Sequence, residues 1–95
     1  MDSRDLEQIE SFLGMVGKPS LFVYYDIRHE SPDAGVEAAI KKRRSWAQGQ
    51  QANPKFRAEA LWLIKNNALI RRTLLQERES YLVYVASTAA RHSLQ

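Results

Sequence analysis

The chain has 95 residues, of which 44% are hydrophobic, and it carries a formal net charge of +3 at pH 7. A chain of this length forms at most one domain, and its apolar content suits a compact core rather than a disordered tail. It contains no cysteine, which excludes disulfide bonds and thiolate metal sites.

Two helices are predicted in the first part of the chain. Residues 5–16 form the first, because their apolar side chains recur at helical spacing. Asp2 or Ser3 can cap its start, and Gly17 ends it. Residues 20–27, SLFVYYDI, are a brief apolar and aromatic run whose length does not separate a strand from a helical turn. We expect a short helix there.

A third helix is predicted over about residues 33–48. Ser31 is placed to cap it, and Pro32 to occupy its first turn. The basic run within this helix lies mainly opposite the apolar stripe, except for Arg43. Its stem must cover the edge of the core while its guanidinium reaches water. The apolar stripe consists of Val36, Ala39, Ile40 and Ala47.

Two further helices are predicted after a polar loop at residues 48–53. Pro54 opens the longer one, about residues 55–76, whose wide apolar arc marks it as the central element. Asn67 falls on its core stripe, and we interpret it as a structural asparagine with satisfied hydrogen bonds. Residues 76–92 alternate in part like a strand, but we favour a helix. The side chains of the long helix that we expect to be mostly buried are Phe56, Trp62, Leu63 and Ile64.

No catalytic constellation is present in the sequence. The two histidines, His29 and His92, have no second histidine or carboxylate at metal-ligand spacing, and Glu30 beside His29 is too common a pairing to count. Glycine is too scarce for a phosphate-cradling loop. We therefore expect no enzyme activity, no metal site and no cofactor.

The most distinctive feature is the basic run KKRR at residues 41–44, followed by Trp46. A nucleic-acid site could hold phosphates with these cations and stack a base on the indole. No recognised DNA-binding or RNA-binding module matches, however, and Arg71-Arg72 is the one other basic strip. A plain solvated helix face also explains such a run.

The central part of the chain has its motifs in a familiar order. YYDI at residues 24–27 precedes SPDA at residues 31–34, and a basic helix, a polar loop and a long apolar helix follow. This order resembles that of a J domain, the co-chaperone module that engages the heat-shock ATPase, in which Tyr-Tyr-x-x-Leu precedes Ser-Pro-Asp-Ala. The resemblance covers about residues 20–75 and implies a helix hairpin whose basic helix is the docking edge.

The tripeptide with which a J domain stimulates the ATPase is missing. That family carries His-Pro-Asp in the loop between its two long helices. Counting from Val36 without gaps, the corresponding positions hold Gln48, Gly49 and Gln50. The resemblance therefore implies a degenerate J domain that keeps the docking edge and does not stimulate a heat-shock ATPase.

These observations lead to one prediction of fold and function. We expect a single all-α domain over residues 1–95, built on an antiparallel helix hairpin, with a J-like core at 20–75 and extra terminal helices at 1–18 and 76–92. We expect a non-catalytic adaptor or assembly domain with a protein partner. It is expected to be cytoplasmic and to have no membrane contact, because signal-peptide and membrane-helix patterns are missing. The expected partner-binding residues are Lys41, Lys42, Arg44, Trp46, Gln48 and Gln50.

Two alternatives remain open. The first is a small basic helical domain that binds nucleic acid through the same cations, for which we expect weak and sequence-indifferent binding. The second is a structural domain that self-associates through its C-terminal helix, which would make it a homo-oligomer. In that case Tyr81, Tyr84 and Val85 would lie in the interface.

Overall fold

A computed structural model of the protein describes the backbone of residues 1–93 and the side chains of residues 1–88. Over the described backbone every regular element is a helix, so the predicted all-α fold is confirmed. In chain order the elements are α1 (Ser3–Val16), α2 (Leu21–Tyr25), α3 (Asp33–Gly49), α4 (Arg57–Lys65), α5 (Asn67–Arg71), the π-helical turn η1 (Arg72–Gln76) and α6 (Arg78–Ser93).

The first two helices have well-defined caps. The Asp2 carboxylate accepts a hydrogen bond from the Arg4 N–H at 2.8 Å, and Gly17 ends α1 at a φ of 70°. Ser20 caps the start of α2 with its side-chain oxygen. Asp26 ends α2 at a φ of 54°, in the left-handed region that Asp enters more readily than most residues. Both helices predicted for this part of the chain are therefore present.

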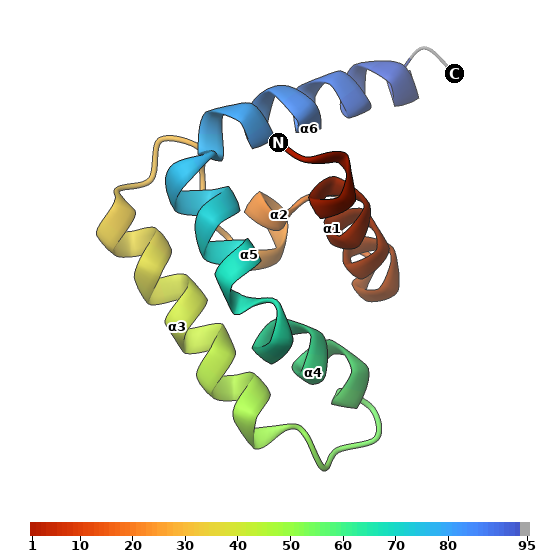
Figure 1. The fold of residues 1–95 in the computed structure, drawn as a ribbon, viewed down its shortest axis with the longest axis vertical. Helices are drawn as coiled ribbons and strands as arrows, with labels where there is room; N and C mark the ends of the chain where they lie inside the picture. The colour runs from red at the N-terminus through yellow and green to blue at the C-terminus, as the bar shows by residue number, and fades with distance from the viewer. Residues whose placement is uncertain (94–95) are drawn as a thin grey trace.

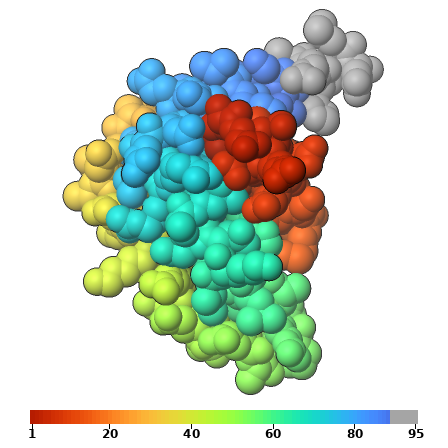
Figure 2. All heavy atoms as spheres, viewed as in Figure 1, coloured from red at the N-terminus to blue at the C-terminus, as the bar shows by residue number. Residues whose placement is uncertain are grey.

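The centre of the fold is the pairing of α3 with α4 and α5, which run alongside it in the opposite direction (Figure 1). Helix α1 packs against α4, and α2 packs against α3. In Figure 2 the side chains of α4 and α5 fill the middle of one face, between α1 and α3, and α6 lies across the top. The buried apolar core consists of Ile9, Phe12, Leu13, Leu21, Val36, Ile40, Ala47, Ala60, Leu63, Leu69, Ile70, Leu74 and Tyr81.

The helix predicted over residues 55–76 begins later than expected. Helix α4 starts at Arg57, and Pro54 lies in the preceding turn rather than in the first helical turn. The side-chain oxygen of Asn53 accepts a hydrogen bond from the Lys55 N–H at 3.1 Å. This local bond favours a turn over a helix, which explains the delayed start.

The same helix is also broken at Asn66. The side-chain nitrogen of Asn66 donates to the carbonyl oxygen of Trp62 at 3.0 Å, and its backbone leaves the helical region at φ −106° and ψ 23°. An asparagine side chain can compete in this way with the backbone hydrogen bonds of a helix. The satisfied structural asparagine is therefore Asn66 and not the predicted Asn67, which is half-buried.

The start of α3 differs from the prediction in its cap. The Ser31 side-chain oxygen accepts a hydrogen bond from the Arg28 N–H at 2.9 Å, so it organises the connector and does not cap the helix. Pro32 stands at the N-cap position with no side-chain hydrogen bond. Beyond its first turn α3 follows the prediction. Three of the four residues of the predicted apolar stripe are buried, and Ala39 is half-buried.

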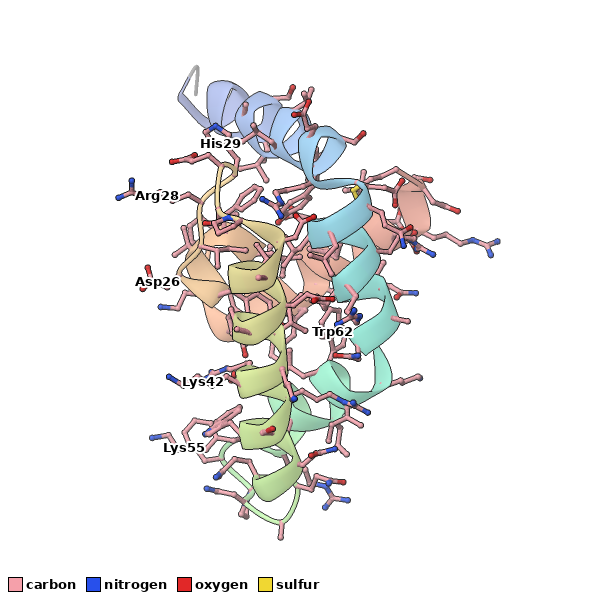
Figure 3. All side chains as sticks on the ribbon, turned by 90° about the vertical axis from the view of Figure 1, so that its left-hand side faces the viewer. Asp26, Arg28, His29, Lys42, Lys55 and Trp62 are labelled. Atoms are coloured by element: carbon pink, nitrogen blue, oxygen red, sulfur yellow. The ribbon has the colours of Figure 1, made fainter. Side chains whose placement is uncertain are left out.

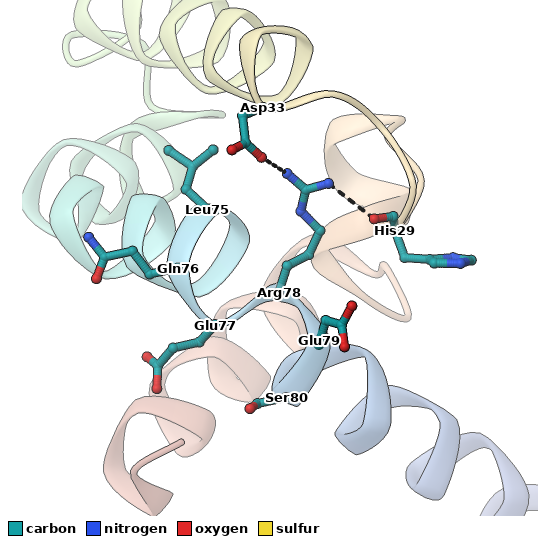
Figure 4. A pocket seen from close by; sticks show the side chains of 8 residues that line it. All are labelled: His29, Asp33, Leu75, Gln76, Glu77, Arg78, Glu79 and Ser80. Atoms are coloured by element: carbon teal, nitrogen blue, oxygen red, sulfur yellow. Dashed lines mark hydrogen bonds and ion pairs between the residues drawn. The ribbon is translucent and has the colours of Figure 1, made fainter.

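Arg78 links the start of α6 to the connector that precedes α3 through hydrogen bonds (Figure 4). Its guanidinium donates to the carbonyl oxygens of His29 and Ser31 at 3.0 and 2.5 Å, and to the Asp33 carboxylate at 2.6 Å. Its Nε also donates to the Leu74 carbonyl oxygen at 2.7 Å. One largely buried side chain thus satisfies carbonyl groups from two segments that lie far apart in the sequence.

The helix predicted over residues 76–92 is confirmed by α6. Tyr81 on this helix is fully buried, and its hydroxyl oxygen accepts a hydrogen bond from the Leu21 N–H at 2.9 Å. A buried Tyr81 cannot lie in an interface between copies, which corrects the alternative that placed it there. Tyr84 and Val85 are half-buried.

Thr73, in the turn η1, is the one buried side chain whose polar atom lacks a hydrogen-bond partner among the described residues. A threonine hydroxyl inside a helix usually donates to the carbonyl oxygen one turn earlier. The backbone of η1 is wound as a π-helix, which displaces the groups that such a bond would use. Burial therefore removes the hydroxyl from water without giving it a hydrogen bond in return, which destabilises the fold.

We expect Thr73→Val to raise the free energy of unfolding by about 1 kcal/mol, because valine keeps the shape and removes the unpaired hydroxyl. Urea denaturation at neutral pH measures the change. The matched control is Thr88→Val, whose hydroxyl donates to the Tyr84 carbonyl oxygen at 3.0 Å and whose loss should therefore not stabilise. A destabilised Thr73→Val variant would show that the hydroxyl has a partner in solution.

Candidate functional site

Five exposed cations lie on both edges of the C-terminal half of α3 and around the loop that follows it. No Asp or Glu occurs over residues 38–58, and the flanking carboxylates, Glu37 and Glu59, pair with Arg71 and Arg43. The ion pairs among the described side chains involve none of the five cations. We call this group the basic tip: Lys41, Lys42, Arg44, Lys55 and Arg57.

Two of the predicted partner-binding residues share the edge of α3 that faces α2. Lys42 and Trp46 are four residues apart, so they lie on the same side of the helix. Figure 3 shows Lys42 projecting on the same side of the molecule as Asp26 and Lys55. Lys55 was not predicted, and it extends this edge beyond the end of α3.

The other predicted residues lie elsewhere. Lys41, Arg44 and Gln48 occupy the opposite edge of α3, because their spacing of three, four and seven residues puts them on one side of the helix. Gln50 belongs to the loop, where its side-chain oxygen accepts a hydrogen bond from the side-chain nitrogen of Asn53 at 3.1 Å. The structure therefore divides the predicted set instead of joining it into one surface.

A series of cation–aromatic contacts runs along the edge of α3 that faces α2. The Nζ of Lys55 lies 5.3 Å from the centre of the Phe56 ring, and the rings of Phe56 and Trp46 meet edge to face at 5.3 Å. The Cζ of Arg43 lies 4.0 Å from the centre of the Trp46 ring and 5.0 Å from that of Tyr24. These contacts fix the indole of Trp46 and cover part of its surface.

Arg43 is held in a hydrogen-bonded triad with Tyr24 and Glu59. Its Nε donates to the Tyr24 hydroxyl at 2.9 Å, and a terminal nitrogen donates to the Glu59 carboxylate at 2.7 Å. The Tyr24 hydroxyl donates to the same carboxylate oxygen at 2.5 Å. The Arg43 side chain is still 37% exposed, and what the prediction did not include is its charge-assisted bond to Glu59 on α4.

The protonation of this triad keeps its charges balanced. Burial, followed by the hydrogen bond to Glu59, raises the pKa of Tyr24 well above its usual value, so the phenol remains a donor. Burial lowers the pKa of Arg43, but its bonds to Tyr24 and Glu59 raise that pKa by more, so the guanidinium remains a cation. Arg43 is neutralised by Glu59, whereas its neighbours Lys42 and Arg44 have no ion pair among the described side chains.

A pocket of about 410 Å³ opens between α2 and α3 beside the triad. Three aromatic residues contribute to its lining, together with charged residues from the end of α2 and from α3. The sequence indicated Tyr24 and Tyr25 only as part of the J-like motif and gave no sign of the pocket itself. The lining residues are Tyr24, Tyr25, Asp26, Ala39, Lys42, Arg43 and Trp46.

The described side chains include no group of three His, Cys, Asp or Glu residues that could hold a metal ion. His29 lies in the exposed connector with its Nδ1 3.0 Å from Glu30, and the side chain of His92 is outside the described part. In the same part of the chain, no helix has the length and apolar character needed to cross a membrane.

No family model, curated protein or solved structure matches this chain. The resemblance to a J domain therefore depends on the sequence motifs alone.

Proposed function

We propose that the protein is a non-catalytic interaction domain, an adaptor or assembly module, that docks on an acidic protein surface through the basic tip. The proposal rests on five exposed cations with no ion pair among the described side chains. Such cations steer an acidic partner and can pair with it without breaking an internal salt bridge. Trp46 and Phe56 beside them are half-buried, and the exposed parts of their rings add aromatic contact area of the kind on which interfaces commonly depend.

The succession of α2, a connector, α3, a loop and α4 supports the resemblance to a J domain. Helix α3 continues to Gly49, so two of the three residues that replace His-Pro-Asp are helical, and none offers an imidazole or a carboxylate. The proposed docking edge therefore works without stimulating a heat-shock ATPase. A cytoplasmic location belongs to the same proposal.

Nucleic acid is the second candidate partner, because the same cations could contact phosphates. The cations are divided between two edges of α3, however, and base stacking needs an open aromatic face. The contacts of Trp46 with Arg43 and Phe56 cover part of its ring. About four phosphate contacts would give a log–log salt slope near −3 to −4 on duplex DNA, so binding should be weak at physiological salt.

Charge reversal at the tip tests the proposal. We expect the triple variant Lys41→Glu/Lys42→Glu/Arg44→Glu to lose the partner that the wild-type domain retains from native lysate after nuclease treatment. The matched control, Arg4→Glu/Lys18→Glu/Lys65→Glu, reverses three exposed cations outside the tip and should retain that partner. Equal losses in both variants would remove the basic tip as the docking site.

Titration of labelled duplex and single strands at about 150 mM salt completes the test. We expect no submicromolar binding to either. Submicromolar binding, or a partner that nuclease removes, would overturn protein docking in favour of the nucleic-acid site.

A further inference from the structure

We infer that the pocket between α2 and α3 receives one apolar side chain, preferably aromatic, from an acidic peptide segment of the partner. This inference rests on the proposed function and goes further, because it adds an apolar anchor to what would otherwise be docking by charge. It also assigns the direction in which the acidic residues of the partner extend from that anchor.

The size and lining of the pocket suit a single large side chain. Its volume of about 410 Å³ is near the lower end of the range for small-molecule sites, about 300–1,000 Å³. Rings of Tyr24, Tyr25 and Trp46 line it, and the small side chain of Ala39 leaves the space between them open. Aromatic walls favour an aromatic or large aliphatic guest over a polar one.

The lining is held in place before any partner binds. Arg43 is fixed by Tyr24 and Glu59 and lies against the Trp46 ring, and the rings of Tyr24 and Tyr25 meet edge to face at 5.0 Å. A pocket with fixed walls loses little side-chain entropy when it is filled, which favours binding. Because Glu59 already neutralises Arg43, that guanidinium does not need an external anion.

The charges around the pocket are asymmetric. Figure 3 shows Asp26, Lys42 and Lys55 in this order along one side of the molecule, with Arg28 beyond Asp26. Arg28 lies 3.9 Å from Glu30, and of these four charged residues Asp26 and Lys42 line the pocket. Carboxylates of a partner are therefore attracted on the side of Lys42 and Lys55 and repelled at Asp26. The segment that fits has its acidic residues on one side of the anchor and neutral residues on the other. A nucleic acid, which carries a phosphate at every step, lacks this asymmetry.

Two fluorescently labelled peptides test the anchor. Each has a block of glutamates on one side of a central residue and neutral residues on the other, and the central residue is phenylalanine in one peptide and alanine in the other. Each is made in two versions, one with the glutamates N-terminal and one with them C-terminal to the central residue. For the wild-type domain we expect the phenylalanine peptide to bind about ten-fold more tightly in at least one direction, as measured by fluorescence anisotropy.

Filling the pocket separates its contribution from that of the charges. We expect Ala39→Trp to abolish the preference for phenylalanine while it leaves the weak, salt-sensitive binding of the alanine peptide unchanged. Ala34→Trp, an exposed position on the first turn of α3 outside the pocket, should keep the preference. Thermal melts establish that the variants fold, and Ala39→Leu replaces Ala39→Trp if the larger side chain unfolds the domain.

A second pair of variants tests the direction of the peptide. Lys42→Glu should weaken both peptides. Asp26→Asn should leave both unchanged and strengthen a third peptide, which has glutamates on both sides of the phenylalanine. Equal binding of the phenylalanine and alanine peptides, or a preference that survives both Ala39 variants, would overturn the anchor. If tip reversal still releases the partner from lysate, the proposed function stands without the pocket.

Discussion

Replacing Leu63 with alanine is expected to lower the free energy of unfolding by about 2–5 kcal/mol. Leu63 lies on α4, is 3% exposed and belongs to the main core cluster. Its truncation removes buried carbon atoms and leaves a cavity that the neighbours fill only in part. The total stability of a domain of this size is about 5–15 kcal/mol, so the variant loses a large share of it.

Leu61→Ala on the same helix is the matched control. The apolar pattern puts Leu61 on a second core stripe, but in the structure its side chain is 43% exposed. Its truncation should change the free energy of unfolding by less than about 1 kcal/mol. Urea melts of both variants show which of the two leucines faces the core. If Leu61→Ala lowered the free energy of unfolding more than Leu63→Ala, α4 would have to be rotated so that Leu61 faces the core, which contradicts the structure.

The other residues expected in the core of the long helix are less buried than Leu63. Phe56, Trp62 and Ile64 are each half-buried. Trp62 stacks on Phe12 of α1 at 4.1 Å between ring centres, and Phe56 meets Trp46 of α3. The wide apolar arc is therefore covered from two sides by α1 and α3, and each of these neighbours leaves part of an aromatic ring in contact with water.

Local chemistry made much of the fold predictable. The Asp2 cap and Gly17 stop of α1 depend on a few neighbouring residues, so the sequence is enough to place them. The period of the apolar residues likewise predicted α3 and favoured a helix for α6. For α6 the strand-like alternation around Tyr81 was outweighed by the helices before it and the alanines after it.

The features that the sequence did not reveal depend on contacts between distant residues. Glu59 meets Arg43 only because α4 packs against α3, and this contact makes an arginine that was expected to face solvent part of a half-buried triad. The pocket has the same origin, because α2 and α3 each supply part of its lining. The helix break at Asn66 has a different origin, because it depends on a local hydrogen bond. Helix propensity alone does not show which of two adjacent asparagines will bond to the backbone.

Replacing Tyr81 with phenylalanine is expected to lower the free energy of unfolding by about 1–3 kcal/mol at neutral pH. The change removes one oxygen atom and keeps the ring, so little packing is lost. What it removes is the acceptor for the Leu21 N–H, 60 positions earlier in the chain, at 2.9 Å. That N–H belongs to the first residue of α2 and has no partner within its own helix. The variant leaves it buried and unpaired.

Tyr84→Phe is the matched control for this change, because it makes the same substitution one turn later on α6 at a half-buried position. It should alter the stability by no more than about 0.5 kcal/mol. Equal effects of the two substitutions in urea melts would show that the bond between Tyr81 and Leu21 does not stabilise the fold.

The pH dependence of the Tyr81→Phe effect provides an independent check. Burial, which outweighs the hydrogen bond from Leu21, raises the pKa of Tyr81 from its usual value near 10 to about 12. Because the folded pKa is the higher one, the stabilisation is intact below pH about 10 and is lost as the pH rises toward about 12. Phenylalanine has no proton to lose, so the difference between wild type and Tyr81→Phe should shrink over this range. A difference that stays constant from pH 8 to about 12 would mean that the hydroxyl is not buried, and that α6 does not close over α2.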